Sequence, residues 1–334
     1  MRNRKTTHLA LGLSAGIVLG GLLGCGGNYS NDDVLFRSAI PTRELLSSKL
    51  TPATAAMRVG PDANVGVGPG PSAGPIAGPT AGPTTWTAVG DSSGLAQFTR
   101  GASVGFNKGL FTILDVLQAV VSLEPSVRNP DERIWGPYPD RQHPGFEVQL
   151  VMDRTADRYD YRVDVRRTGT TDWTKVIAGD FQATGGLREG RGSLHFLDAA
   201  ARGAGYDPVQ SDVASIDASY QTKAQPVTVD LKVMSVAQTE PLLAFSFAGQ
   251  ADGGGQMRFD VSAQLAGGDA SPLETLEILS QWKPDGQGRA DAQIVSGDWV
   301  GASYVECWSA QDAILYSVAT WSTPVGEEAS CAVF

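Results

Sequence analysis

Histidine and cysteine are scarce in this chain, which contains three of each among 334 residues. Apart from His8, only His143 and His195 are present. A protein-bound metal ion needs several ligands at fixed spacing, and neither histidine has such neighbours in the sequence. His195 alternates with Leu194 and Phe196, which is typical of a solvent-facing position on a strand. We therefore expect no metal and no cofactor.

Basic side chains are also few, with 26 lysines and arginines against 36 aspartates and glutamates. Three of the basic residues lie among the first five positions, so the rest of the chain carries a formal charge of about −13. A surface this acidic repels phosphate backbones. Nucleic acid is therefore not an expected partner.

Serine-hydrolase signatures appear only in isolation. Of three glycine-flanked serines, only Ser103, in Gly101–Gly105, lies next to a helical pattern. The corresponding fold needs a parallel sheet and a histidine late in the chain, and the sequence predicts neither. We interpret Ser103 as a helix-start residue and expect no enzyme. An extracytoplasmic hydrolase stays as a remote alternative.

The N-terminus has the layout of a secretory signal, with a basic start and a short apolar run from Leu9 to Leu23. This run ends in Leu22-Leu23-Gly24-Cys25, which resembles the lipobox of bacterial lipoproteins. The resemblance implies cleavage before Cys25, lipidation of that cysteine and, because Gly26 follows it, sorting to the outer membrane. Several acyl chains together give a stable membrane anchor.

We divide the chain into a signal peptide over residues 1–24, a flexible tether over 25–85 and one β-rich domain over 86–334. The tether contains three consecutive four-residue repeats ending in Ala-Gly-Pro, which bury too little apolar surface to fold. About 60 flexible residues reach roughly 40 Å, so the domain is expected to lie away from the membrane. One short helix is predicted inside the tether, with Thr42 as its N-cap and Leu45, Leu46 and Leu50 on one side.

The segment Asn107–Leu123 carries apolar residues at helical spacing around most of its circumference. Pro125 ends the pattern. The segment is too short to span a membrane, so a buried core helix is the better interpretation.

From Phe146 onward the apolar residues alternate with polar ones in many short runs. The clearest run places Tyr159, Tyr161, Val163 and Val165 between charged residues. This period of two predicts an antiparallel meander with one buried face. We expect a curved sheet or partly open barrel of about 10–12 strands with the apolar helix packed on it. A β-sandwich is the alternative.

Only Cys307 and Cys331 remain once Cys25 is lipidated. An even pair in an oxidising compartment predicts a disulfide, and the alternative is a zinc or redox site. Three landmarks are similar to those of a group of Gram-negative outer-membrane lipoproteins: Arg133-Ile-Trp-Gly-Pro137, Glu306-Cys-Trp308 and a C-terminal cysteine. The resemblance implies a lipid anchor, a β-rich domain and the same cysteine pair, and it implies no activity.

The leading functional hypothesis is a non-catalytic module of the cell envelope, held at the outer membrane, that binds an apolar ligand or lipid in a concave cavity. Its candidate rim residues combine aromatic bodies with polar tips, and they are Trp135, Tyr138, Asp140 and His143. The alternative is a structural or adhesive envelope protein that acts through protein–protein contacts. The alternative for these four residues is a packed corner of the fold that binds no ligand.

Overall fold

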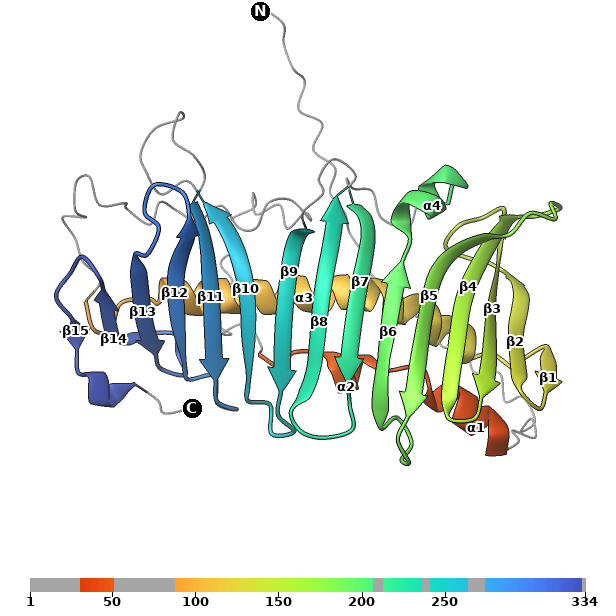
Figure 1. Ribbon diagram of the computed structural model, residues 1–334, viewed down its shortest axis with the longest axis horizontal. Helices are drawn as coiled ribbons and strands as arrows, with labels where there is room; N and C mark the ends of the chain where they lie inside the picture. The colour runs from red at the N-terminus through yellow and green to blue at the C-terminus, as the bar shows by residue number, and fades with distance from the viewer. Residues whose placement is uncertain (1–30, 51–87, 207–212, 236–240, 264–273, 332–334) are drawn as a thin grey trace, which may run out of the picture.

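The computed structural model describes residues 31–50, 88–206, 213–235, 241–263 and 274–331. It contains one open sheet of 15 antiparallel strands that follow one another in chain order (Figure 1). The sheet does not close into a barrel, because β1 and β15 remain its two edges. The prediction of a curved antiparallel sheet with a packed helix is confirmed. The strand number is higher than expected, and the alternative of a sandwich is wrong.

Each strand pairs with the strand before it and the strand after it, so almost all contacts in the sheet are between neighbours in the sequence. The strands are β1 (Val127–Asn129), β2 (Glu132–Pro139), β3 (Phe146–Thr155), β4 (Arg158–Arg167), β5 (Thr174–Ala183), β6 (Gly190–Phe196), β7 (Val213–Gln221), β8 (Val227–Ser235), β9 (Pro241–Gly249), β10 (Gly255–Ala263), β11 (Glu274–Trp282), β12 (Gly288–Ser296), β13 (Ser303–Trp308), β14 (Ile314–Ala319) and β15 (Val325–Gly326). The helices are α1 (Asn31–Ser38), α2 (Arg43–Leu46), α3 (Gly94–Val121), α4 (Asp198–Gly203) and the short 3-10 helix η1 (Glu328–Ser330).

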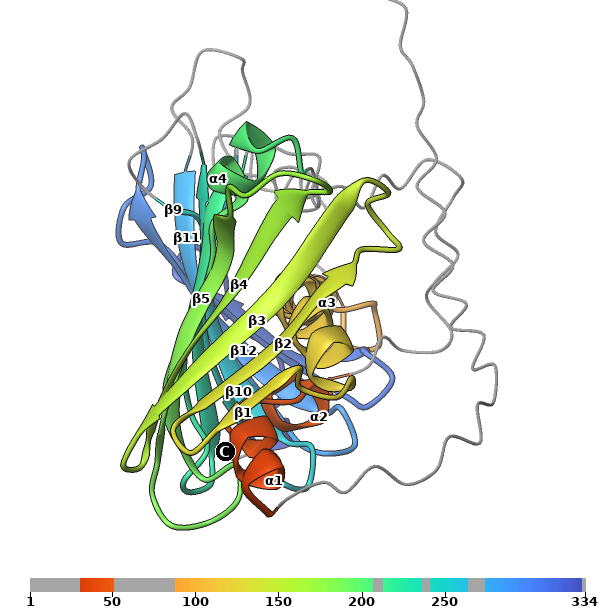
Figure 2. The same ribbon diagram turned by 90° about the vertical axis from the view of Figure 1, so that its right-hand side faces the viewer.

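The sheet bends into a trough, and α3 lies along its concave face (Figure 2). Eleven side chains of α3 are buried, among them the fully enclosed Leu110, Ile113 and Leu117. By length and composition alone this helix could cross a membrane. The apolar side of α3 packs against the sheet, and the prediction of a core helix is confirmed.

The helix begins 13 residues earlier than the sequence predicted, at Gly94 instead of Asn107. Ser93 caps it by accepting a hydrogen bond from the Ala96 amide at 2.9 Å. Glycines and polar residues weaken the periodicity of this half, so burial in the trough decides its conformation. Ser103 consequently lies inside the helix and not at its start. Its hydroxyl donates a hydrogen bond to Ser48 Oγ at 2.8 Å.

Polar contacts fix α3 to the last strands of the sheet. The buried Glu306 carboxylate of β13 accepts hydrogen bonds from Ser93 Oγ and from the Leu95 amide at the helix N-terminus. A carboxylate at this position complements the positive end of the helix dipole. Arg100 reaches from the first half of α3 to Asp312 in a bidentate ion pair, whose closest approach is 2.6 Å.

Residues 31–50 are folded, which corrects the prediction of a tether over 25–85. The predicted short helix exists as α2 with Thr42 at its N-cap position. The segment that contains α1 and α2 buries Phe36, Ile40 and Leu46 in the same core as α3. The prediction missed these 20 residues because it treated them together with the glycine and proline repeats that follow them. The remaining predicted tether, 51–85, and the predicted lipidation site Cys25 lie outside the described residues.

Glycines leave room for large aromatic rings that lie against the sheet. At Gly288 on β12, an added Cβ would lie 2.4 Å from the ring of Trp308 on β13. The Trp308 ring covers this glycine, and its indole nitrogen donates to the Gly286 carbonyl at 3.1 Å. Gly192 on β6 makes a similar close approach to Tyr220 on β7. Such pairs let adjacent strands curve around a bulky side chain without a void.

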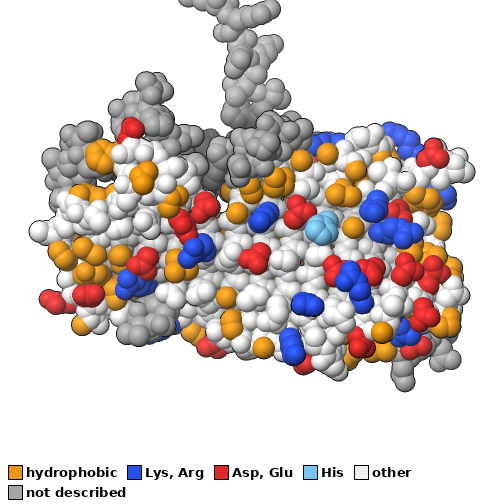
Figure 3. Space-filling model, in the orientation of Figure 1, with side chains coloured by type: hydrophobic (Ala, Val, Ile, Leu, Met, Phe, Trp, Pro, Cys, Tyr) orange, Lys and Arg blue, Asp and Glu red, His pale blue; other side chains and the backbone are white. Residues whose placement is uncertain are grey.

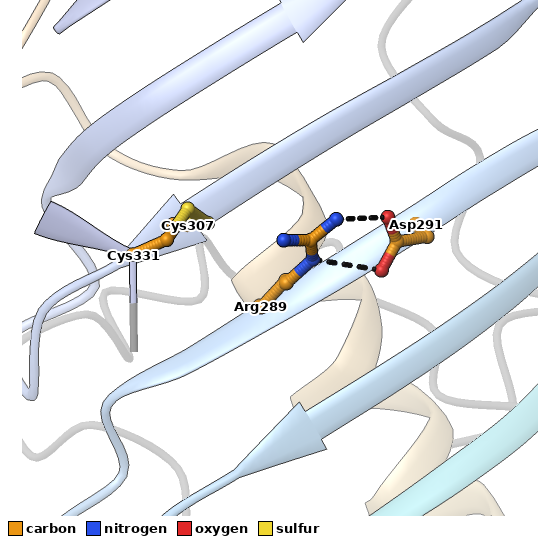
Figure 4. The surroundings of a disulfide bond; sticks show 4 residues. All are labelled: Arg289, Asp291, Cys307 and Cys331. Carbon is orange, nitrogen blue, oxygen red and sulfur yellow. Dashed lines mark hydrogen bonds and ion pairs between the residues drawn. A yellow bond between two sulfur atoms is a disulfide. The ribbon is translucent and has the colours of Figure 1, made fainter. Parts of the chain in front are cut away.

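The predicted disulfide between Cys307 and Cys331 is present, with a Cα–Cα distance of 5.4 Å (Figure 4). It ties the C-terminal segment, which includes β15 and η1, to β13. The edge strand β15 pairs with β14 through only two residues. At the other edge β1 has three residues. Edge strands this short offer little template for pairing with a second sheet.

Candidate functional site

The concave face of the sheet packs closely against the middle of α3. Side chains that face α3 from the sheet, such as Leu150, Met152 and Val163, have no exposed area. The opposing leucines of α3 have none either. A cavity that admits a water-sized probe would leave area exposed on its walls, so these side chains enclose no room for an acyl chain. The expected binding of an apolar ligand in a concave cavity stays a prediction.

The four predicted rim residues do not form one rim. Trp135 is fully buried inside the core, which corrects its assignment to a half-wet mouth. It lies at a bulge of β2, where Gly136 adopts a φ of +106° beside the Val148 carbonyl of β3. Tyr138 is half-buried, and its hydroxyl donates to the Glu124 carbonyl between α3 and β1. For these two residues the interpretation as a packed corner describes the structure.

Asp140 and His143 do come together, in the loop between β2 and β3. The Nδ1 atom of His143 lies 3.0 Å from Asp140 Oδ2, and the Tyr206 hydroxyl donates to the same oxygen at 2.7 Å. The rings of His143 and Tyr206 lie with centroids 4.1 Å apart. Tyr206 was missed from the sequence because it follows α4, about 60 residues later in the chain.

Burial alone would raise the pKa of Asp140. Hydrogen bonds from Tyr206, from the His143 side chain and from the backbone amides of Gln142 and His143 outweigh burial and lower that pKa. Burial and the bond to Asp140 raise the pKa of Tyr206. The cluster is therefore an aspartate held ionised by two side chains and two backbone amides, which is a stabilising arrangement for this loop.

Neither histidine belongs to a nucleophile–base pair among the described residues. On the convex face, His195 Nδ1 lies 2.7 Å from Asp217 Oδ1, and Ser215 donates to Asp217 at 2.9 Å. In both clusters the hydroxyl contacts the carboxylate and not the imidazole. A serine hydrolase of the Ser-His-Asp type needs the hydroxyl to contact the imidazole. Within the part of the chain that the structure covers, no three potential ligands are arranged to hold a metal ion.

The convex face carries a depression of about 370 Å³ across β5, β6, β7 and β8. We name it the outer furrow. Its floor is a row of short side chains that lie opposite one another in the strand register, and its rim is the next row, made of long side chains. The floor residues are Asp180, Ser193, Ser219 and Asp230, and the rim residues are Arg158, Gln182, Arg191, Gln221 and Thr228.

The furrow offers both hydrogen-bond donors and acceptors. Asp180 accepts from Ser193 and lies 3.7 Å from an Arg158 nitrogen. Asp230 at the other end accepts from Ser246 at 2.6 Å. Arg191 is exposed on the rim and makes no ion pair with any residue that the structure describes. Figure 3 shows the mixture of acidic and basic side chains across this face.

The furrow could not be found from the sequence. Its residues are spaced at intervals of two along each strand, as on any solvated sheet face. Only the register of four neighbouring strands aligns the short residues into one row and the long residues into the next. The backbone of Gly192 also lines the furrow.

The landmark residues of the sequence occupy structural positions. Gly136 forms the bulge in β2, Glu306 caps α3, and Trp308 covers Gly288. Comparisons of the chain with protein-family models, with curated proteins and with solved structures find no match.

Proposed function

We propose that this protein is a lipid-anchored module of the cell envelope that binds a polar ligand, without catalysis, in the outer furrow. The signal-like N-terminus and its lipobox resemblance support the location. The observation that carries the binding role is the furrow itself, an open hollow on the convex face that brings together acidic, basic and neutral polar side chains.

The lining favours a saccharide that bears a carboxylate. Sugar hydroxyls both donate and accept hydrogen bonds, and the serines, glutamines and aspartates of the furrow supply matching partners. Arg191 supplies a cation for the carboxylate. The acidic surface as a whole disfavours ligands with many negative charges. A single acidic group on a neutral saccharide therefore fits best.

The test is a titration of the purified full chain with oligosaccharides that contain a uronic acid, followed by calorimetry. We expect binding that Arg191→Ala weakens by about ten- to a hundredfold, because a charge-assisted hydrogen bond contributes roughly 1.5–3 kcal/mol. Ser219→Trp should abolish binding by filling the floor. His195→Ala is the matched control, since His195 lies on the same face in the row beyond the floor.

Two results would contradict the proposal. One is the absence of binding to any acidic or neutral saccharide. The other is a lipid retained by the purified protein in native mass spectrometry, which would favour the apolar-ligand hypothesis and require α3 to leave the trough.

A further inference from the structure

The proposed lipid attachment site and the first helix of the fold are close in sequence. Five residues, 26–30, separate Cys25 from Asn31, where α1 begins. A fully extended chain spans at most about 3.6 Å per residue, so α1 begins no more than about 20 Å from the lipidated residue. The inference below rests on the proposed lipid attachment at Cys25. If Cys25 is lipidated, the folded part of the chain begins beside the bilayer and not after a tether of about 60 residues.

Contacts between α1 and the sheet fix the direction in which the fold faces the bilayer. Asp33 is fully buried and accepts hydrogen bonds from Arg133 Nε at 2.7 Å and from Arg128 Nε at 3.0 Å. Phe36 packs edge-on against Tyr159 of β4, with ring centroids 5.5 Å apart. These contacts hold α1 at the lower edge of the sheet in Figure 1. Whatever lies next to α1 therefore also lies next to this edge.

Two large apolar side chains of α1 are exposed, next to the exposed Asp32. Val34 and Leu35 are 47% and 38% exposed, although both are large aliphatic residues. Leu123 is 43% exposed, and its carbonyl accepts a hydrogen bond from Arg37 of α1. Leu187 is 60% exposed in the turn between β5 and β6, at the same edge as the β3–β4 turn beside α1. Of the eight exposed large hydrophobic side chains among the described residues, two thus lie on α1, one lies next to it, and one lies in a turn at the same edge of the sheet.

Charged groups near α1 are compensated. Arg154 lies 4.0 Å from Asp32 and 3.9 Å from Asp131, and Arg128 and Arg133 share Asp33. The edge therefore lacks the surplus of basic residues that attracts proteins to anionic lipids. Contact with a bilayer here depends on apolar side chains.

We propose that Val34, Leu35, Leu123 and Leu187 form a membrane-contacting surface that docks the fold onto the bilayer next to its lipid anchor. The partner is the headgroup boundary of a membrane of neutral lipid, into which side chains at an interface reach about 5–10 Å. The anchor keeps this surface at a high local concentration near the bilayer, so a weak apolar contact suffices. The loop that holds Asp140 and His143 lies at the opposite edge of the sheet and faces away from the membrane.

The test uses full-length protein that has been lipidated in a bacterial host and reconstituted into phosphatidylcholine vesicles. Val34→Cys and, separately, Leu35→Cys carry an environment-sensitive fluorophore. Val300→Cys is the matched control, because Val300 is an exposed valine in the turn between β12 and β13, at the other edge of the sheet. Mass spectrometry of the N-terminal peptide establishes whether Cys25 carries its acyl chains.

We expect a blue-shifted emission from the labels at positions 34 and 35, and severalfold stronger quenching by brominated lipid than at position 300. Adding anionic lipid should leave this difference unchanged. Equal quenching at positions 34 and 300 in protein with an acylated Cys25 would overturn the docking surface and leave the anchor intact. An unmodified Cys25 would overturn the lipid anchor and the docking surface together.

Discussion

The buried carboxylate that fastens α1 to the sheet gives the sharpest test of the fold. Asp33 has no exposed area and forms ion pairs with Arg133, whose side chain is 4% exposed, and with Arg128. Replacing Asp33 by Asn keeps the shape of the side chain and removes its charge. The Arg133 guanidinium is then left buried without a carboxylate partner.

Breaking a buried ion pair from one side costs about 3–5 kcal/mol. Domains of ordinary stability unfold with about 5–15 kcal/mol, so the change would remove a large share of the total. Because α1 lies near one end of the chain, it can detach before the sheet unfolds, which limits the loss to the free energy that docks α1. Hydrogen exchange of the α1 amides should therefore accelerate more than exchange in β4.

The matched control is Asp115→Asn. Asp115 also pairs with an arginine, Arg43, but both side chains are nearly half exposed. Such a pair contributes about 0–1 kcal/mol. Urea denaturation of both variants, with hydrogen exchange read by mass spectrometry, compares the two losses directly. If Asp33→Asn loses no more stability than Asp115→Asn, the buried pair does not hold α1, and the reasoning fails.

Three further predictions concern other parts of the fold. Cys331→Ser opens a disulfide loop of 24 residues and should cost roughly 3 kcal/mol, seen as a lower melting temperature that matches reduced wild type. The pKa values of Asp33 and Asp140 are lower in the folded than in the unfolded state, so their ionised forms stabilise the fold above the unfolded pKa of about 4. This stabilisation is lost as the pH falls below about 4, and the urea midpoint of unfolding should drop there. The drop should be smaller in the Asp140→Asn variant. Gly192→Ala puts a Cβ 2.3 Å from the Asp180 carbonyl and should destabilise by about 1–3 kcal/mol in thermal melts, whereas Gly105→Ala on the open side of α3 meets no atom within 4 Å and should stabilise the helix.

The alternating patterns of the sequence were sufficient to predict the fold class. Tyr159, Tyr161 and Val163 line the buried side of β4 as expected, because a period of two reports directly on which side of a strand is buried. The pattern of Leu110 to Leu117 predicted the core of α3 for the same reason. The cysteine pair was predicted by setting Cys25 aside as the expected lipidation site. The strands and the central helix are predictable because their patterns depend on residues that are close together in the sequence.

The site and the packing of the chain ends depend on residues that are distant in sequence. The Gly94 half of α3 is helical because the trough buries it, and Phe36 belongs to the core because the lower edge of the sheet has room for it. Tyr206 meets Asp140 only through the fold. The outer furrow exists because the strand register aligns Ser193 with Ser219. The sequence by itself therefore determined the strands, the central helix and the disulfide, whereas the tertiary structure decided curvature, register and which polar groups meet. The reason is that periodicity records local burial, while register and curvature are set by contacts between strands.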